Sequence, residues 1–229
     1  MIGGSSGIGL ATARGAQDAG ARVSIAARNP ERLAAARKTL GGHVKTIPVD
    51  ATSEDEVRRL FDLVDEVDHV ATFAGSLAFG RILETDTDQL REGMEGRFWG
   101  AANICKHAAP RMNDGGSITL CSGVAGIRSR PGRSMGAAST VAVEAFARAT
   151  ALELAPVRVN AVCPGVIDTP LADDLLGARK EEAYAEQAKR IPLGRVGRAE
   201  EVADAVLFLM TNPFVTGTVL VVDGGYCLV

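Results

Sequence analysis

The amino-acid sequence predicts a single α/β domain in which helices cover both faces of a parallel β-sheet. Short apolar segments rich in valine and isoleucine alternate with longer segments of helical periodicity along all 229 residues. Strands that alternate with helices are joined by right-handed crossovers, which make the strands parallel. No repeat, linker or low-complexity segment interrupts the pattern, and the length suits one domain spanning residues 1–229.

Six segments have the composition of buried strands, because branched apolar residues dominate them and Gly, Pro or Asp bounds them. The predicted strands are residues 22–27, 43–49, 67–74, 117–122, 157–163 and 218–222. The predicted helices are residues 8–19, 30–40, 53–64, 88–112, 136–154 and 199–210. Two of these helices begin with a start signal: Pro30 stands at a first helical position, and Ser53 with Glu56 has capping-box spacing.

A glycine-rich turn opens the first predicted helix and indicates a phosphate site. It reads Gly3-Gly4-Ser5-Ser6-Gly7-Ile8-Gly9. The first glycine permits a tight turn, the third lets the backbone approach a pyrophosphate, and the fourth lets the helix pack closely on a strand. The helix N-terminus then offers free N–H groups and a positive dipole end to phosphates. Only Met1 and Ile2 precede the turn, so we expect a truncated first strand and residues upstream of Met1.

Two loops that follow predicted strands bear on the choice of dinucleotide. Arg28 and Asn29 come directly after the strand at 22–27. An acidic residue there would accept a hydrogen bond from a ribose 2′-hydroxyl, whereas Arg28 suits a 2′-phosphate and therefore favours NADP(H) over NAD(H). Asp50, followed by Ala51, is placed to bond an adenine amine. A solvated loop arginine at 28 and a turn or helix cap at 50 are the structural alternatives.

The order and spacing of several motifs resemble the short-chain dehydrogenase/reductase family over essentially the whole chain. The motifs are the glycine turn, Val49-Asp50, Ala74-Gly75, the run from Arg158 to Pro170, the run from Leu193 to Gly197, Glu200, and the run from Val222 to Gly225. The resemblance implies a doubly wound, Rossmann-type sheet of about seven parallel strands, a bound NAD(P) and an oligomer. It also implies cofactor contacts at Ala74, Gly75, Pro164, Gly165, Val166, Ile167 and Thr169.

The four positions that carry catalysis in this family all differ in this chain. Family members use Asn, Ser, Tyr and Lys: the Tyr hydroxyl donates the proton, the Lys lowers its pKa, and the Ser orients the substrate oxygen. By register these positions fall on Arg97, Gly123, Gly136 and Thr140. No tyrosine precedes Tyr184, so a one-residue shift restores nothing. The chain resembles an atypical subgroup with a basic residue before Phe-Trp-Gly and Ser-Gly in place of Ser-Ser.

Arg97 and Ser122 are the remaining candidates for catalysis. Arg97 could place positive charge near a developing oxyanion, but a guanidinium is a poor acid because its pKa is about 12.5 or above. Ser122 is the hydroxyl nearest to the vacant serine position, although strand alternation points it to the opposite face. The alternatives are an ion pair of Arg97 with Glu92, Glu95 or a partner chain, and a strand-end Ser122 hydroxyl bonded to backbone.

Two functions of different class remain open. The first is an NADP(H)-dependent oxidoreductase that acts on an unidentified carbonyl compound or alcohol, with Arg97 and Ser122 in a non-standard site. The second is a non-catalytic NADP(H)-binding protein, either a sensor or a structural partner. The glycine at position 136 favours the second, and the complete run beside the nicotinamide favours the first. We interpret residues 171–190 as a substrate lid without a pattern that identifies the substrate.

Composition argues against several other classes. The net charge of −3 with no basic cluster is not that of a nucleic-acid-binding protein. No apolar run reaches the roughly 18 residues that a membrane helix needs, and no signal peptide is visible. The four cysteines show no CxxC spacing, which favours reduced thiols in a cytoplasmic protein, and no metal-ligand pattern is present.

Two predicted helices have wider apolar faces than surface helices need. They are residues 88–112 and 136–154, whose apolar side chains include Phe98, Trp99, Val141, Val143 and Phe146. We expect these helices to pair with their equivalents across a two-fold axis, and the C-terminal segment to make a second contact. The expected assembly is a homotetramer or a homodimer.

Overall fold

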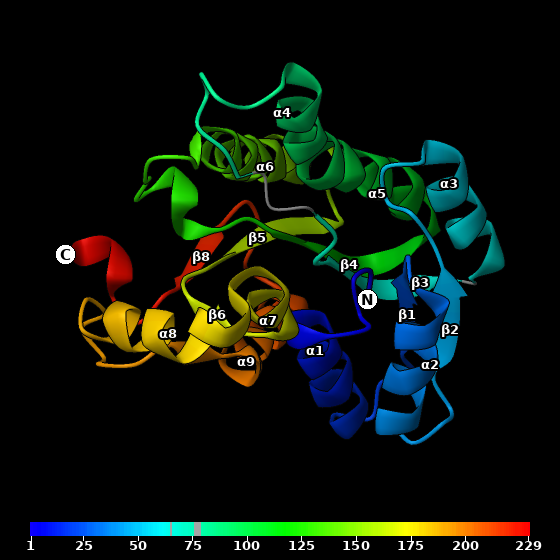
Figure 1. Ribbon diagram of the computed structural model, residues 1–229. Helices are drawn as coiled ribbons and strands as arrows, with labels where there is room; N and C mark the ends of the chain where they lie inside the picture. Colours follow the sequence, from blue (N-terminus) through cyan, green and yellow to red (C-terminus); the bar gives the residue numbers. More distant parts are fainter. Residues whose placement is uncertain (65, 76–78) are drawn as a thin grey trace.

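The computed structural model describes residues 1–64, 66–75 and 79–229, and it confirms the predicted α/β fold (Figure 1). A parallel sheet lies between two layers of helices. Its named strands are β1 (Ser24–Ala27), β2 (Lys45–Pro48), β3 (Val67–Thr72), β4 (Met112–Cys121), β5 (Arg158–Pro164) and β8 (Val219–Val222). All six predicted strands are therefore present.

The helices separate into two layers because each buries one apolar face against the sheet. One layer consists of α3 (Glu54–Leu63), α4 (Thr87–Met94), α5 (Gly100–Ala108) and α6 (Ser134–Glu153). The other consists of α1 (Gly7–Asp18), α2 (Pro30–Thr39) and α9 (Ala199–Thr211). Buried residues of α3, α5 and α6 share one core cluster with the sheet. Residues of α1 and α2 belong to a second cluster, and residues of α9 belong to a third.

Ile2 joins two groups of strands into one sheet. β1 pairs with β2, and the second group has the order β3-β4-β5-β8. Ile2 makes parallel bridges to Ala26 of β1 and to Thr72 of β3. Its N–H donates to Ala71 O at 2.9 Å, and its carbonyl accepts from Phe73 N at 2.8 Å. In the order of the sheet, Ile2 therefore lies between β1 and β3.

The predicted helix 88–112 is wrong as one continuous helix. It divides into α4, a π-helical turn at Glu95–Trp99, α5 and a 3₁₀ turn at Ala109–Arg111, after which β4 begins at Met112. Pro110 lies in the 3₁₀ turn, where its missing N–H cannot extend the α-helical ladder. The π-helical turn contains Arg97, and such turns are frequent at functional sites.

The segment interpreted as a lid is largely helical. α7 (Pro170–Leu176), a 3₁₀ turn at Gly177–Arg179 and α8 (Lys180–Ala188) follow the short strand β6 (Ile167–Asp168). β6 pairs in parallel with β7 (Gly197–Arg198), which closes the segment at its far end. None of the described helices is long and apolar enough to cross a membrane.

Candidate functional site

The glycine turn before α1 has the shape of a phosphate cradle. Gly3 has a φ of +78°, which side chains rarely adopt, and a Cβ at Gly9 would overlap the Gly3 carbonyl oxygen. Ser6 makes no side-chain cap to α1, and the first turn of that helix contains no acidic residue. The N–H groups at the start of α1 are therefore left for an external anion. A pyrophosphate fits this turn, which comprises Gly3, Ser5, Ser6, Gly7, Ile8 and Gly9.

Two other predicted cofactor segments meet this turn. A Cβ built at Gly7 would lie 3.2 Å from the side chain of Thr169, in the run that follows β5. A Cβ built at Gly3 would lie 3.0 Å from the N atom of Ala74, in the run that follows β3. Gly197 N donates to Val166 O at 2.9 Å, which fixes the run from Pro164 through Gly165, Val166 and Ile167 to Thr169. The fold thus gathers these segments at the carboxyl ends of parallel strands, where α/β sheets bind ligands.

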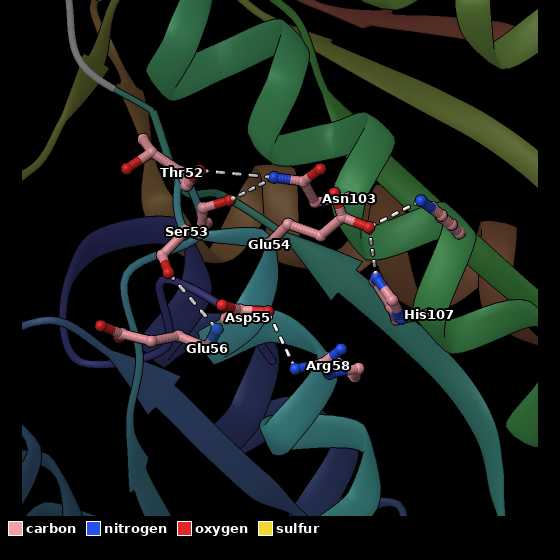
Figure 2. Close-up of polar contacts among 10 residues, drawn as sticks. Thr52, Ser53, Glu54, Asp55, Glu56, Arg58, Asn103 and His107 are labelled. Atoms are coloured by element: carbon pink, nitrogen blue, oxygen red, sulfur yellow. Dashed lines mark hydrogen bonds and ion pairs between the residues drawn. The ribbon is translucent and has the colours of Figure 1, made fainter.

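The loop after β2, predicted to hold the adenine, is anchored to α5. Figure 2 shows Asn103 reaching from α5 to this loop, where its Nδ2 donates to Ala51 O at 3.3 Å. Asp50 Oδ1 accepts from Thr52 N and from Thr52 Oγ1, both at 2.9 Å. The turn-cap alternative for Asp50 is therefore present in the structure, and its contact with adenine stays a prediction.

A charged contact fixes the start of α3 to α5 (Figure 2). Glu54 Oε1 accepts from Lys106 Nζ at 2.6 Å and lies 3.1 Å from His107 Nε2. These two contacts, that of Lys106 first, lower the pKa of Glu54.

The predicted capping box is only half formed: Ser53 Oγ accepts from Glu56 N at 3.4 Å, but the Glu56 carboxylate accepts from Asp50 N instead.

The loop between β1 and α2 presents Arg28 to solvent. Within the described residues, Arg28 makes no hydrogen bond or ion pair, so its guanidinium is available to a 2′-phosphate. Asn29 is the N-cap of α2, and its Oδ1 accepts from Arg32 N at 2.9 Å. The side chain of Asn29 is thus engaged in capping.

Arg97 points from the π-helical turn to the carboxyl end of β4. Its Nη1 donates to Ser122 O at 2.8 Å, and a Cβ at Gly75 would lie 3.6 Å from its Cα and Cβ. Its Nε is buried and has no partner among the described residues, which also supply no ion pair to Arg97. A buried, unpaired donor of a charged group is costly, so this N–H is suited to donate a hydrogen bond to a ligand oxygen.

Ser122 turns its hydroxyl into the protein interior, as strand alternation predicts. The residue is 3% exposed, and Oγ lies 3.0 Å from Glu144 Oε1 and 3.3 Å from Val162 O. The contact with the Val162 carbonyl is that of the structural alternative, a strand-end hydroxyl bonded to backbone. Glu144 of α6 is itself buried and was not singled out from the sequence.

Of the positions to which register assigns the family's Ser, Tyr and Lys (Gly123, Gly136 and Thr140), the first and the last lie close together next to Pro164 of β5. A Cβ at Gly123 would lie 3.6 Å from Thr140 Cγ2 and 3.9 Å from Pro164 O, which is ordinary contact. Gly123 has an extended backbone with φ 167°, so a serine side chain fits there. Thr140 is buried, and its Oγ1 donates to Ala137 O at 2.8 Å. Gly136 stands in the first turn of α6, and none of the three carries a titratable group.

The cysteine thiols are further candidates for reactive groups, but burial disfavours their ionised form. All four cysteines are free, and burial raises the pKa of Cys163 to about 12 and that of Cys227 to about 11. Because the thiolate is the nucleophile, the raised pKa disfavours reaction of Cys163 and Cys227 near neutral pH. Among the described residues, no three His, Cys, Asp or Glu side chains gather to hold a metal ion.

The parallel sheet, the glycine turn and the loops at its carboxyl edge define a dinucleotide-binding α/β protein. A family model described as Enoyl-(Acyl carrier protein) reductase matches residues 3–227. The chain belongs to the short-chain dehydrogenase/reductase family, as its motifs indicated.

Curated relatives and solved structures agree with this membership. The chain is 36% identical to a 3-oxoacyl-[acyl-carrier-protein] reductase of Homo sapiens, over 100% of this chain and 97% of the relative. It is 34% identical to carbonyl reductase family member 4 of Xenopus laevis, over 98% of this chain and 95% of that relative. A small-chain dehydrogenase in complex with NADPH superposes with a TM-score of 0.88 at 31% identity, over 100% of this chain and 97% of that one. The MalC reductase/Diels-Alderase of Malbranchea aurantiaca superposes with a TM-score of 0.92 at 30% sequence identity. The match covers 100% of this chain and 95% of that one.

Proposed function

We propose that the chain is an NADP(H)-dependent oxidoreductase that reduces a carbonyl compound, or oxidises the matching alcohol, with Arg97 at its centre. The observation that supports this most is the buried, unpaired Nε of Arg97 beside Gly75 and the end of β4. The relatives named as reductases, and the neighbour described in complex with NADPH, support the reaction class and the cofactor. The same proposal places the chain in an atypical subgroup of the family that lacks the usual Asn, Ser, Tyr and Lys residues.

The residues of the site divide into binding and reacting groups. The glycine turn and the N-terminus of α1 would hold the pyrophosphate, and Arg28 would hold the 2′-phosphate. The loops after β2, β3 and β5 would hold the remaining parts of the dinucleotide. NADPH, when bound, supplies the hydride. Arg97 donates its Nε–H to the oxygen that becomes negative as the hydride arrives at the carbonyl carbon. Water delivers the proton to that oxygen, because a guanidinium is too weak an acid.

Two linked assays test this function. NADPH is titrated while its fluorescence is followed, and oxidation of NADPH is then measured with a panel of aldehydes and ketones. Saturable binding together with turnover of at least one carbonyl supports the oxidoreductase. Failure to bind NADPH contradicts both this proposal and its alternative.

The alternative is a non-catalytic NADP(H)-binding protein, a sensor or a structural partner. It is favoured by the absence of a titratable group at Gly123, Gly136 and Thr140, together with the inward hydroxyl of Ser122. Removing a general acid lowers a rate by about 10²- to 10⁴-fold. Tight NADPH binding without turnover across the panel would select this alternative.

We expect Arg28 to make the chain prefer NADPH over NADH by about 10- to 100-fold in Kd. The reason is that charge-assisted bonds to a 2′-phosphate contribute about 1.5–3 kcal/mol. Replacement of Arg28 by aspartate should reverse the preference, since a carboxylate repels that phosphate and accepts from a 2′-hydroxyl. Fluorescence titration of both dinucleotides measures this, with Arg59→Asp, an exposed change on α3, as the control. Equal affinities in the native chain, or an unchanged preference in Arg28→Asp, would show that Arg28 is a solvated loop residue.

We propose a homotetramer, or a homodimer if only one interface forms. Trp99 is 51% exposed and packs edge-on against Phe98, which packs edge-on against Phe146 of α6. Val141, also in α6, is 48% exposed. Val143, in contrast, is buried in the core of its own chain. A second group of exposed apolar side chains comprises Phe208, Phe214, Val221 and Leu228.

Light scattering at micromolar concentration is expected to give the mass of a tetramer. The variant Trp99→Asp with Val141→Asp should reduce it to a dimer, because it places charges on one proposed interface. Phe208→Asp with Val221→Asp should do the same at the other. A monomeric native chain would end the proposal.

A further inference from the structure

Three arginines lie in the one loop that connects the segment after β4 to α6. The loop of residues 127–133 joins Gly126 to α6, so it lies between the vacant positions 123 and 136. Arg128 Cζ lies 4.7 Å, and Arg130 Cζ 5.4 Å, from the centre of the Tyr226 ring. Arg133 Cζ lies 3.8 Å from the centre of the Phe79 ring. We call these three residues the arginine cluster.

The arginine cluster has no carboxylate partner among the described residues. Arg128 Nη1 donates to Tyr226 O at 2.7 Å, and Arg130 Nη2 donates to Gln187 Oε1 at 2.9 Å; both acceptors are neutral. Partial burial, followed by the charge of Arg130, lowers the pKa of Arg133. Elsewhere in the chain, Lys180 lies 2.8 Å from both Asp168 and Asp173. Three like charges without a counter-charge attract an external anion.

Open space adjoins the cluster on two sides. An open surface depression of about 790 Å³ is lined by Arg128, Lys189 and Arg190, by apolar residues such as Ile191, and by Val229. A second depression, of about 340 Å³, is lined by Arg81 and Arg130. The carboxylate in the second depression, Glu84, lies 3.9 Å from Arg81. Lys189 pairs with the exposed Glu186, whereas Arg128 and Arg190 line the same depression without an ion pair to the described residues.

Packing contacts connect the C-terminal segment, on which two of the arginines lie, to the run that follows β5. Tyr226, on which Arg128 and Arg130 stack, comes three residues after Asp223. A Cβ at Gly165 would lie 2.7 Å from Asp223 Cα, so this C-terminal segment packs on the run beside the nicotinamide. The same run contacts position 123 through Pro164.

We propose that the arginine cluster binds an anionic group, carboxylate or phosphate, of the carbonyl substrate. This inference rests on the proposed function and names its substrate class: ketones or aldehydes with a negative charge remote from the carbonyl. The guanidinium forks of Arg128 and Arg130 hold the anion, while the carbonyl end lies at Arg97. Binding energy from the remote charge positions the reacting carbon, a task that the serine position no longer performs.

Matched substrates test the proposal. NADPH oxidation is measured with para-acetylbenzoate and with its methyl ester, and with para-acetylphenyl phosphate and para-hydroxyacetophenone. The native chain should show a kcat/KM at least about tenfold higher for each anion than for its neutral partner. The arm with the higher value identifies the anion as carboxylate or phosphate. Equal values within both pairs would overturn the inference and leave the oxidoreductase intact.

Arginine variants locate the effect. Arg128→Gln and Arg133→Gln should lower kcat/KM for the anions about tenfold and leave the neutral substrates unchanged. The Arg133 side chain makes no hydrogen bond or ion pair to the described residues, so its replacement removes the charge and the contact with the Phe79 ring but keeps the backbone bonds to Arg130 and Ala137. Arg59→Gln, on the opposite part of the chain, should change neither. Equal losses for anionic and neutral substrates would contradict the assignment.

Calorimetry separates this inference from the proposed function. Para-acetylbenzoate and para-acetylphenyl phosphate are titrated into the chain with NADPH bound. Binding by the native chain that weakens at least tenfold in Arg128→Gln with Arg130→Gln supports the anion site, even if no substrate turns over. Absence of binding, or equal binding by the variant, overturns the anion site even if a neutral carbonyl is reduced.

Discussion

Replacing Arg97 by alanine is expected to lower kcat for carbonyl reduction by about 10²- to 10³-fold and to leave NADPH affinity unchanged. Losses of this size follow when one donor to a developing oxyanion is removed. The Nε of Arg97 is buried without a partner, and its Nη1 is held by Ser122 O, so the guanidinium is already oriented before substrate binds. Rapid-mixing kinetics with NADPH and a confirmed substrate would measure the effect.

Two further variants control this result. Arg97→Lys retains the charge but loses the planar fork, and we expect an intermediate rate. Arg91→Ala on α4 is the matched control, because Arg91 is exposed and contacts Asp88 at 2.7 Å one turn earlier. Full turnover by Arg97→Ala on that substrate would show that Arg97 is structural. The search would then move to Ser122 and to the lid at residues 171–190.

Restoring the usual family residues is expected to raise the reductase rate by about 10²-fold or more, the contribution of a positioned general acid. The variant combines Gly123→Ser, Gly136→Tyr and Thr140→Lys. The serine fits because a Cβ at position 123 makes only ordinary contacts with Thr140 and Pro164. Position 140 is buried, and we expect the lysine ammonium to need the bound dinucleotide as its partner. The gain should therefore appear in the presence of NADPH.

The pH dependence and a matched variant identify the source of that gain. A tyrosine donates its proton only while protonated, so the restored rate should fall as pH rises through the tyrosine pKa. The native chain should lack this ionisation, since Gly136 and Thr140 have none. The control replaces Gly136 by phenylalanine within the same combination, giving equal bulk without a hydroxyl. An equal rate in the tyrosine and phenylalanine variants would contradict the vacant-site interpretation.

Local composition was sufficient to predict the strands and most helices. Branched apolar residues bounded by Gly, Pro or Asp identify strands in almost any context, as β5 illustrates. The π-helical turn at Glu95–Trp99 was missed, because a π turn does not alter the apolar pattern over such a short distance. The start of β4 at Met112 was also missed, since it depends on pairing with Val67 across the sheet.

The candidate site could be predicted only where it follows chain order. The glycine turn, Arg28 and the vacant position 123 are defined by register, and strand alternation gave the direction of Ser122. Contacts between distant residues left no signal in a single sequence. Ser122 to Glu144 spans 22 positions, Asn103 to Ala51 spans 52, and Arg128 to Tyr226 spans 98. The arginine cluster in particular exists only once the C-terminal segment folds back on the loop.

Transfer of deuterium from NADPH labelled at the reactive nicotinamide carbon tests most directly whether the chain is an oxidoreductase. The labelled cofactor is incubated with the native chain and a panel of anionic and neutral carbonyl compounds, and the products are analysed by mass spectrometry. We predict an alcohol that carries one deuterium on the former carbonyl carbon, formed by the native chain and strongly reduced with Arg97→Ala. Saturable NADPH binding with no deuterium in any product would contradict the oxidoreductase and establish a binding protein in its place.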